Sequence, residues 1–149
     1  MSQVLSLRLP DALVERLDRF ARRQGNRMTR TKAGLLLLDE ALRENEFASI
    51  EFRDSPVGRQ AYMKDSGLAV WEVILIAQHH EMDAERVAHY FQRPVEWVKA
   101  ALNYYEAYRE EIDQMIEDNR LGYDALKRLL PNLRLVEIPR EVLRGEQEL

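Results

Sequence analysis

Leucine alternates with other residues at the start of the chain. It fills every second position from Leu5 to Leu9 within VLSLRL, residues 4–9. This period of two predicts one short β-strand with an apolar side. The other side of that strand carries Val4, Ser6 and Arg8.

Two helices are expected to follow the strand. The first begins after Pro10 and ends before Gly25, with apolar residues at helical spacing between them. The second begins at Thr29, whose hydroxyl can cap the first turn, and contains four consecutive leucines, 35–38. A lone strand lacks a ladder partner, and a helix apolar nearly all round needs burial on several sides. Two copies of the segment satisfy both needs, so we expect a homodimer or a higher assembly.

Helical periodicity resumes in the second half of the chain. Residues 49–67 are irregular, with the short extended candidates IEFR and AYMK. A helix then begins near Val70, a short one after Asp83, and a long one at Pro94. The last two predict a helix-turn-helix. After Asn119 we expect one short helix near residues 125–130 and an extended LRLVEIP.

The predicted fold class is mostly α with one short N-terminal β-strand. The expected organisation is a dimerisation and DNA-binding module at 1–47, a helix-turn-helix-like helical domain at 48–119 and a partner-binding segment at 120–149.

The charged residues are distributed unevenly along the chain, although the net charge is small. The net charge is -4. Up to residue 34 eight basic residues oppose three acidic ones, a balance of +5, so the remainder carries -9. A local basic patch at the front is therefore the place to seek a polyanion partner.

Composition excludes several kinds of chemistry. The chain has no cysteine, which excludes thiolate catalysis and cysteine metal sites. His79, His80 and His89 match no metal-ligand spacing, and we expect them to be solvated at helix ends. No phosphate loop or nucleophile elbow is present. We therefore expect no enzyme, no metal and no cofactor, and the absence of a secretory-type or membrane-length apolar run favours a cytoplasmic protein.

The strand followed by a Thr-capped second helix resembles the ribbon-helix-helix family of dimeric DNA-binding repressors and antitoxins, over about the first 46 residues. The resemblance implies that the outward strand residues enter the major groove of double-stranded operator DNA. It also implies that the start of the second helix clamps phosphates, which free amides favour physically. The implied DNA-binding residues are Val4, Ser6, Arg8, Thr29, Arg30, Thr31 and Lys32. A module that only dimerises is the alternative.

Residues from about Phe52 to Asn119, with GLAVWEVI, DAERVAHYF and ALNYYEAYREEI, resemble a family of small helix-turn-helix-like domains of unknown function. Those domains are predicted antitoxins of PIN-like ribonuclease toxins. The resemblance implies an antitoxin that represses its own operon. The alternatives are a free-standing transcriptional repressor whose rear domain oligomerises or senses a ligand, and an adaptor that never touches DNA.

The C-terminal segment either packs back on the helical domain or binds the partner. Guanidinium groups suit a nuclease that holds metal ions with carboxylates, and nearby apolar residues can anchor the contact. The residues expected to bind the toxin are Arg134, Arg140, Arg144, Leu135 and Ile138.

Overall fold

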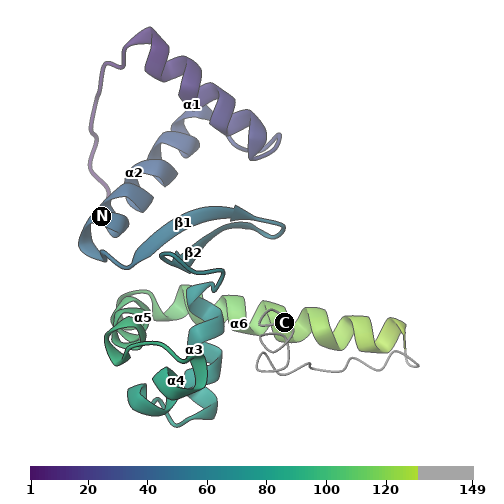
Figure 1. Ribbon diagram of the computed structural model, residues 1–149. Helices are drawn as coiled ribbons and strands as arrows, with labels where there is room; N and C mark the ends of the chain where they lie inside the picture. Colours follow the sequence, from purple (N-terminus) through teal and green to yellow (C-terminus); the bar gives the residue numbers. More distant parts are fainter. Residues whose placement is uncertain (131–149) are drawn as a thin grey trace, which may run out of the picture.

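The computed structural model describes residues 1–130. This part of the chain is mostly helical, as expected, with one two-stranded antiparallel sheet (Figure 1). The elements are α1 (Asp11–Arg23), α2 (Arg30–Glu46), β1 (Ile50–Ser55), β2 (Gly58–Met63), α3 (Val70–His79), α4 (Ala84–Phe91), α5 (Val95–Ala107) and α6 (Arg109–Leu129).

Local capping signals fix several of the helix starts. The Thr29 hydroxyl accepts the amide of Lys32 at 3.2 Å, and α2 begins at the next residue. The Asp83 carboxylate accepts the amides of Glu85 and Arg86 at the start of α4. Each cap satisfies helix-end donors that have no carbonyl partner. The predicted helix starts at Pro10, Thr29 and Asp83 are therefore confirmed.

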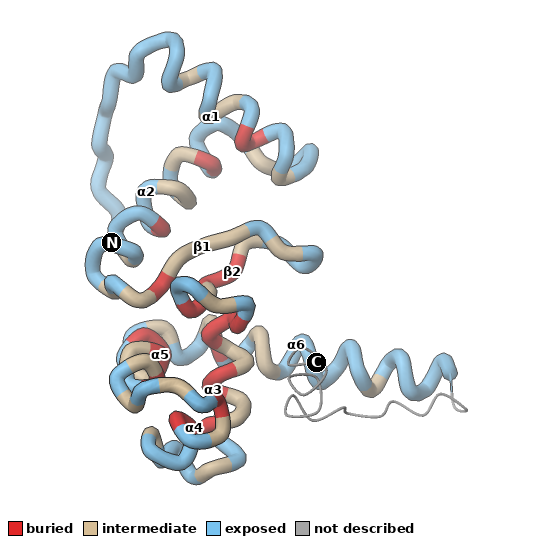
Figure 2. The backbone as a smooth tube through the Cα atoms, in the orientation of Figure 1, coloured by how far each residue is buried: buried red, intermediate tan, exposed pale blue. Residues whose placement is uncertain are grey.

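The strand expected at residues 4–9 does not form in the single chain. Residues 1–10 are extended and exposed and carry no strand (Figures 1 and 2). A strand needs a neighbouring ladder, and no segment of residues 1–130 offers one there. The two strands lie instead at the extended candidates IEFR and AYMK. They pair in register from Ile50 opposite Met63 to Ser55 opposite Gly58.

The helices α3 to α6, which we call the rear body, form the larger apolar core together with Ile50, Ala61 and Met63 of the hairpin. Tyr104, Ile112 and Val98 are fully buried in it. The smaller cluster of α1 and α2 contains only Phe20, Ala21 and Ala33 as buried residues. The front module, residues 1–46, thus has little core of its own.

Two expectations for the rear body need correction. His79 and His89 are exposed, as expected, whereas His80 is only partly exposed, because its ring centre lies 5.6 Å from that of Tyr90 and its Nδ1 is buried. The separate helix expected at 125–130 is also wrong, because α6 runs without a break from Arg109 across Asn119 to Leu129. The acidic and basic residues along this helix pair locally, as Arg120 does with Glu117 and Asp124 and so support a continuous helix.

A buried ion pair joins the front module to the hairpin. Arg59 of β2 donates two hydrogen bonds to the Glu40 carboxylate of α2, at 2.8 and 3.0 Å. Only 5% of the Glu40 side chain and 19% of the Arg59 side chain are exposed. The hydrogen bonds that Arg59 donates to the Glu40 carboxylate raise the pKa of Arg59. The two charges therefore pair at a site where either charge alone would destabilise the fold.

A second contact joins α2 directly to the rear body. The Arg43 guanidinium donates to the Tyr104 hydroxyl and to Glu111 Oε2, both at 2.9 Å. It also lies 3.7 Å from the centre of the Tyr108 ring. Burial is the main reason that the pKa of Tyr104 is raised, so its hydroxyl stays neutral and hydrogen-bonded. Arg43 is thus held by charge, hydrogen bonds and an aromatic face together.

We predict that Glu40→Ala lowers the free energy of unfolding by about 3 kcal/mol, because it leaves the Arg59 charge half-buried with only Asp54 beside it. Arg120→Ala removes a pair that lies wholly on the surface and serves as the control. Urea denaturation of both variants at neutral pH tests this. Equal stabilities would show that the Glu40 pair contributes no more than a surface pair.

Candidate nucleic-acid interface

The predicted DNA-reading residues lie on an exposed segment. Val4, Ser6 and Arg8 are all exposed, and so are Leu5 and Leu7 on the other side of the segment. If the chain offered this segment an apolar surface, the leucine side would pack against it and not remain in water. In the described chain, both sides of this segment are therefore open to solvent.

The helix α2 has two apolar faces, of which only one is covered. Ala33 and Leu37 face α1 in the small front cluster. Leu35, Leu38 and Leu42, spaced at i, i+3 and i+7, share the opposite side and are 69%, 47% and 52% exposed. An apolar stripe of this spacing is typical of a helix that packs on another helix. Within residues 1–130 no element covers it.

The start of α2 offers unpaired backbone donors. The amide of Lys32 is taken by Thr29, and the amide of Ala33 bonds to the Thr29 carbonyl. In the described part of the chain, the amides of Arg30 and Thr31 donate to nothing. Lys32 is exposed beside them. Free amides at the positive end of a helix, with a cation next to them, suit a phosphate group.

The Arg30 side chain is held in an ion pair with α1. Its guanidinium donates Nε to Asp18 Oδ1 and Nη2 to Asp18 Oδ2, each at 2.9 Å. The hydrogen bonds from Arg30 lower the pKa of Asp18. This bidentate ion pair connects the start of α2 to α1 and partly neutralises the charge of Arg30. The backbone amide of Arg30, rather than its side chain, is then the better phosphate donor.

Within one chain, the two groups of predicted DNA-binding residues are not brought together. Figure 1 shows the N-terminus well separated from the start of α2. A single surface that joined both groups would therefore need a rearranged N-terminal segment, a second copy, or both.

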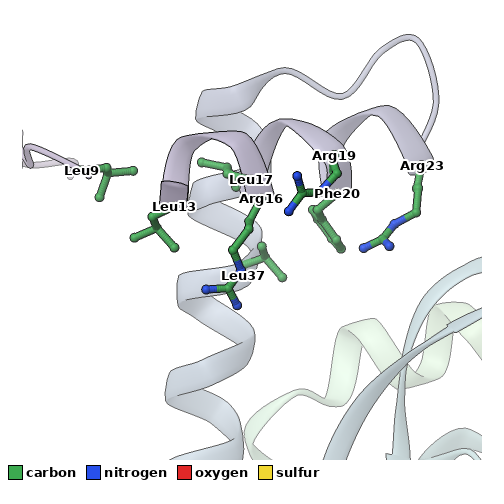
Figure 3. Close-up of a pocket in the computed structure, with 8 residues that line it drawn as sticks. All are labelled: Leu9, Leu13, Arg16, Leu17, Arg19, Phe20, Arg23 and Leu37. Atoms are coloured by element: carbon green, nitrogen blue, oxygen red, sulfur yellow. The ribbon is translucent and has the colours of Figure 1, made fainter. Parts of the chain in front are cut away.

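Three arginines of α1 were missed by the sequence reasoning. They surround a pocket of about 470 Å³ between α1 and α2 that has an apolar floor (Figure 3). Their spacing at positions 16, 19 and 23 was a signal that one helix side is basic. The lining residues are Leu9, Leu13, Arg16, Leu17, Arg19, Phe20, Arg23 and Leu37.

Two further kinds of feature are absent from the described residues. In residues 1–130 no three histidine, aspartate or glutamate side chains gather as a metal site would require. No helix in that same range combines the length and the apolar character needed to cross a membrane. The residues predicted to bind a toxin, from Arg134 to Arg144, lie outside the described residues.

Comparisons of this chain with protein-family models, curated proteins and solved structures find no match. Its function therefore has to be inferred from the chemistry of its own residues.

We predict that Arg8 and Lys32 contribute differently to DNA binding. Arg8→Ala should remove about 1 to 3 kcal/mol of discrimination between operator and random DNA, because a bidentate base contact is lost. Lys32→Ala should lower the affinity for all DNA sequences equally. It should also reduce the slope of log affinity against log salt concentration by about one. Titrations of operator and random duplexes at several salt concentrations measure both quantities.

The control is Lys64→Ala, which removes an exposed lysine outside the front module and should change neither quantity. If Arg8→Ala and Lys32→Ala gave the same loss on every sequence, the division between base reading and phosphate binding would be wrong.

Proposed function

We propose that this protein is the antitoxin of a toxin-antitoxin pair. In this proposal residues 1–46 of two copies form a ribbon-helix-helix dimer that binds operator DNA and represses the operon. The rear of each chain binds and neutralises a PIN-like ribonuclease toxin. The protein acts by binding and is not an enzyme.

The observation that carries the proposal is the uncovered leucine stripe of α2. The side of α2 that packs on α1 carries Ala33 and Leu37. The exposed leucines 35, 38 and 42 lie on the opposite side and so do not contact α1. Burying apolar area contributes roughly 25 cal/mol per Å². Covering three exposed leucines along one side of α2 would therefore favour association substantially. A second copy supplies an identical stripe, and its strand supplies the missing ladder.

The charge of the front module supports DNA as its target. The balance of +5 up to residue 34 is more than dimerisation requires. The exposed outward residues Ser6 and Arg8 are of the types that read base edges, and the start of α2 has free amides for a phosphate. Val4 is the weakest of the expected contacts, because it is limited to an apolar contact such as a thymine methyl group.

Support for the toxin partner comes from the rear of the chain. The resemblance of residues 52–119 to predicted antitoxin domains indicates a protein partner. The strongly acidic exposed surface of α6, with Glu110, Asp113, Glu117 and Asp118, would repel DNA. Opposite charges at the two ends suit two different partners.

We predict that Leu38→Asp converts the dimer into a monomer and abolishes operator binding, because a carboxylate would be buried at the centre of the leucine stripe. The matched control is Val57→Asp, which places the same charge on an apolar residue that is 82% exposed at the hairpin turn. Sedimentation velocity and DNA titration of both variants provide the two readouts.

Leu37→Asp should behave differently from Leu38→Asp, because Leu37 packs in the cluster of its own chain. It should unfold the front module and lower the helical circular dichroism signal. A Leu38→Asp protein that sediments like the wild type and binds operator as well as Val57→Asp does would contradict the proposed dimer.

A further inference from the structure

The pocket between α1 and α2 combines an apolar floor with a basic wall (Figure 3). Its volume of about 470 Å³ lies within the range of small-molecule sites in proteins. Five of its lining residues are apolar, the other three are Arg16, Arg19 and Arg23, and none is acidic. The lining therefore suits a ligand that is partly apolar and negatively charged.

The helical spacing of α1 places the basic wall beside the apolar floor. At 100° per residue, the three arginines fall within a sector of about 60°, and Leu13, Leu17 and Phe20 fall within a neighbouring sector of about 60°. The acidic residues of the helix lie on the far side of the arginines from this floor, and they are Asp11, Glu15 and Asp18. The side of α1 that faces the pocket thus carries basic and apolar residues only.

Two of the three arginines have no partner in the described chain. Within residues 1–130 the guanidinium groups of Arg16 and Arg19 form no ion pair. Arg23 lies near Asp54, whose pKa is lowered mainly by a hydrogen bond from Gln24 and further by Arg59 and Arg23. Like charges three residues apart on a helix repel each other. An anion beside Arg16 and Arg19 would remove this repulsion.

The pocket is separate from the surface that the proposed dimer buries. Leu37 of α2 lines the pocket, whereas the leucine stripe lies on the opposite side of that helix. Residues 1–9 carry no carboxylate, so the N-terminal segment of either copy would leave the arginines unpaired. A flat partner such as a DNA duplex or a membrane would meet the arginines but not the floor, where Phe20 is only 8% exposed. Depth and charge together favour a small molecule.

We propose that this pocket binds a small organic anion in which an apolar body carries one carboxylate or phosphate group. The apolar body contacts Leu13, Leu17 and Phe20, and its burial there supplies part of the affinity. The anionic group accepts hydrogen bonds from the guanidinium groups of Arg16 and Arg19, which stay charged at every physiological pH. This binding site does not depend on the proposed antitoxin function.

The test is a chemical-shift titration of the isotope-labelled full chain with octanoate, which joins an apolar chain to one carboxylate. A ligand of this size should bind with a Kd of about 1 mM. It should shift the amide signals of α1 and Leu37 along saturable curves. Because 1-octanol lacks the charge and acetate lacks the apolar chain, each should bind about tenfold more weakly or worse.

Reversing the charge of the basic wall should reverse the preferred ligand. Arg16→Glu with Arg19→Glu should weaken octanoate binding about tenfold or more, and this variant should bind octylammonium instead. The matched control is Arg22→Glu with Arg27→Glu, because both of these arginines are exposed and neither lines the pocket. The control changes the net charge by the same amount and should bind octanoate as the wild type does.

Three results would overturn the proposal. They are equal binding of octanoate by the two double variants, equal binding of octanoate and 1-octanol by the wild type, and no saturable binding of octanoate by the wild type. If, in the last case, only the variant with Arg16→Glu and Arg19→Glu lost affinity for random duplex DNA, these arginines would be phosphate contacts of the DNA surface. None of these results decides the antitoxin proposal, which the Leu38→Asp experiment tests.

Discussion

The organisation of this protein depends on α2, which is packed or bonded on every side but one. Ala33 and Leu37 contact α1, and Glu40 and Arg43 hold the hairpin and the rear body. The remaining side is the stripe of Leu35, Leu38 and Leu42, which nothing in residues 1–130 covers. Because the front module buries only three apolar residues, Phe20, Ala21 and Ala33, we infer that its stability depends on what covers that stripe. The proposed dimer follows from this one requirement.

The same helix also keeps the two proposed activities apart. Its start holds the free amides that suit a phosphate, and its last turns hold the Arg43 contact with Tyr104 and Glu111. A helix of 17 residues is about 25 Å long, so the rear body sits well away from the phosphate end. A protein docked on the rear body would not need to cover the DNA surface. Ion pairs and aromatic packing together make this joint, since Phe47, directly after α2, packs edge-on against Tyr104.

The sequence predicted features that depend on nearby residues and did not predict those that depend on residues far along the chain. Thr29 and Asp83 predicted helix starts because a cap acts within three residues. The break between α5 and α6 at Tyr108 carries no glycine or proline to announce it. The partners of Arg43 lie 61 and 68 residues along the chain, and no spacing rule reaches that far. The strand expected at residues 4–9 would need a pairing partner that residues 1–130 do not supply. Of the candidate site, residue types and the Thr29 cap were predictable, whereas the capture of Arg30 by Asp18 was not.

The central claim is that residues 4–9 of two copies pair as antiparallel strands. The chain contains no cysteine, so Ser6→Cys introduces a single thiol. A twofold axis through the middle of residues 4–8 sets the two residues 6 opposite each other, with Cβ atoms about 5 Å apart, close enough for a disulfide after a small shift. Lys99→Cys, on the exposed side of α5, is the control. Under mild oxidation at micromolar concentration the account predicts a covalent dimer of Ser6→Cys within minutes and little of the control. Equal, slow cross-linking of both variants would contradict it.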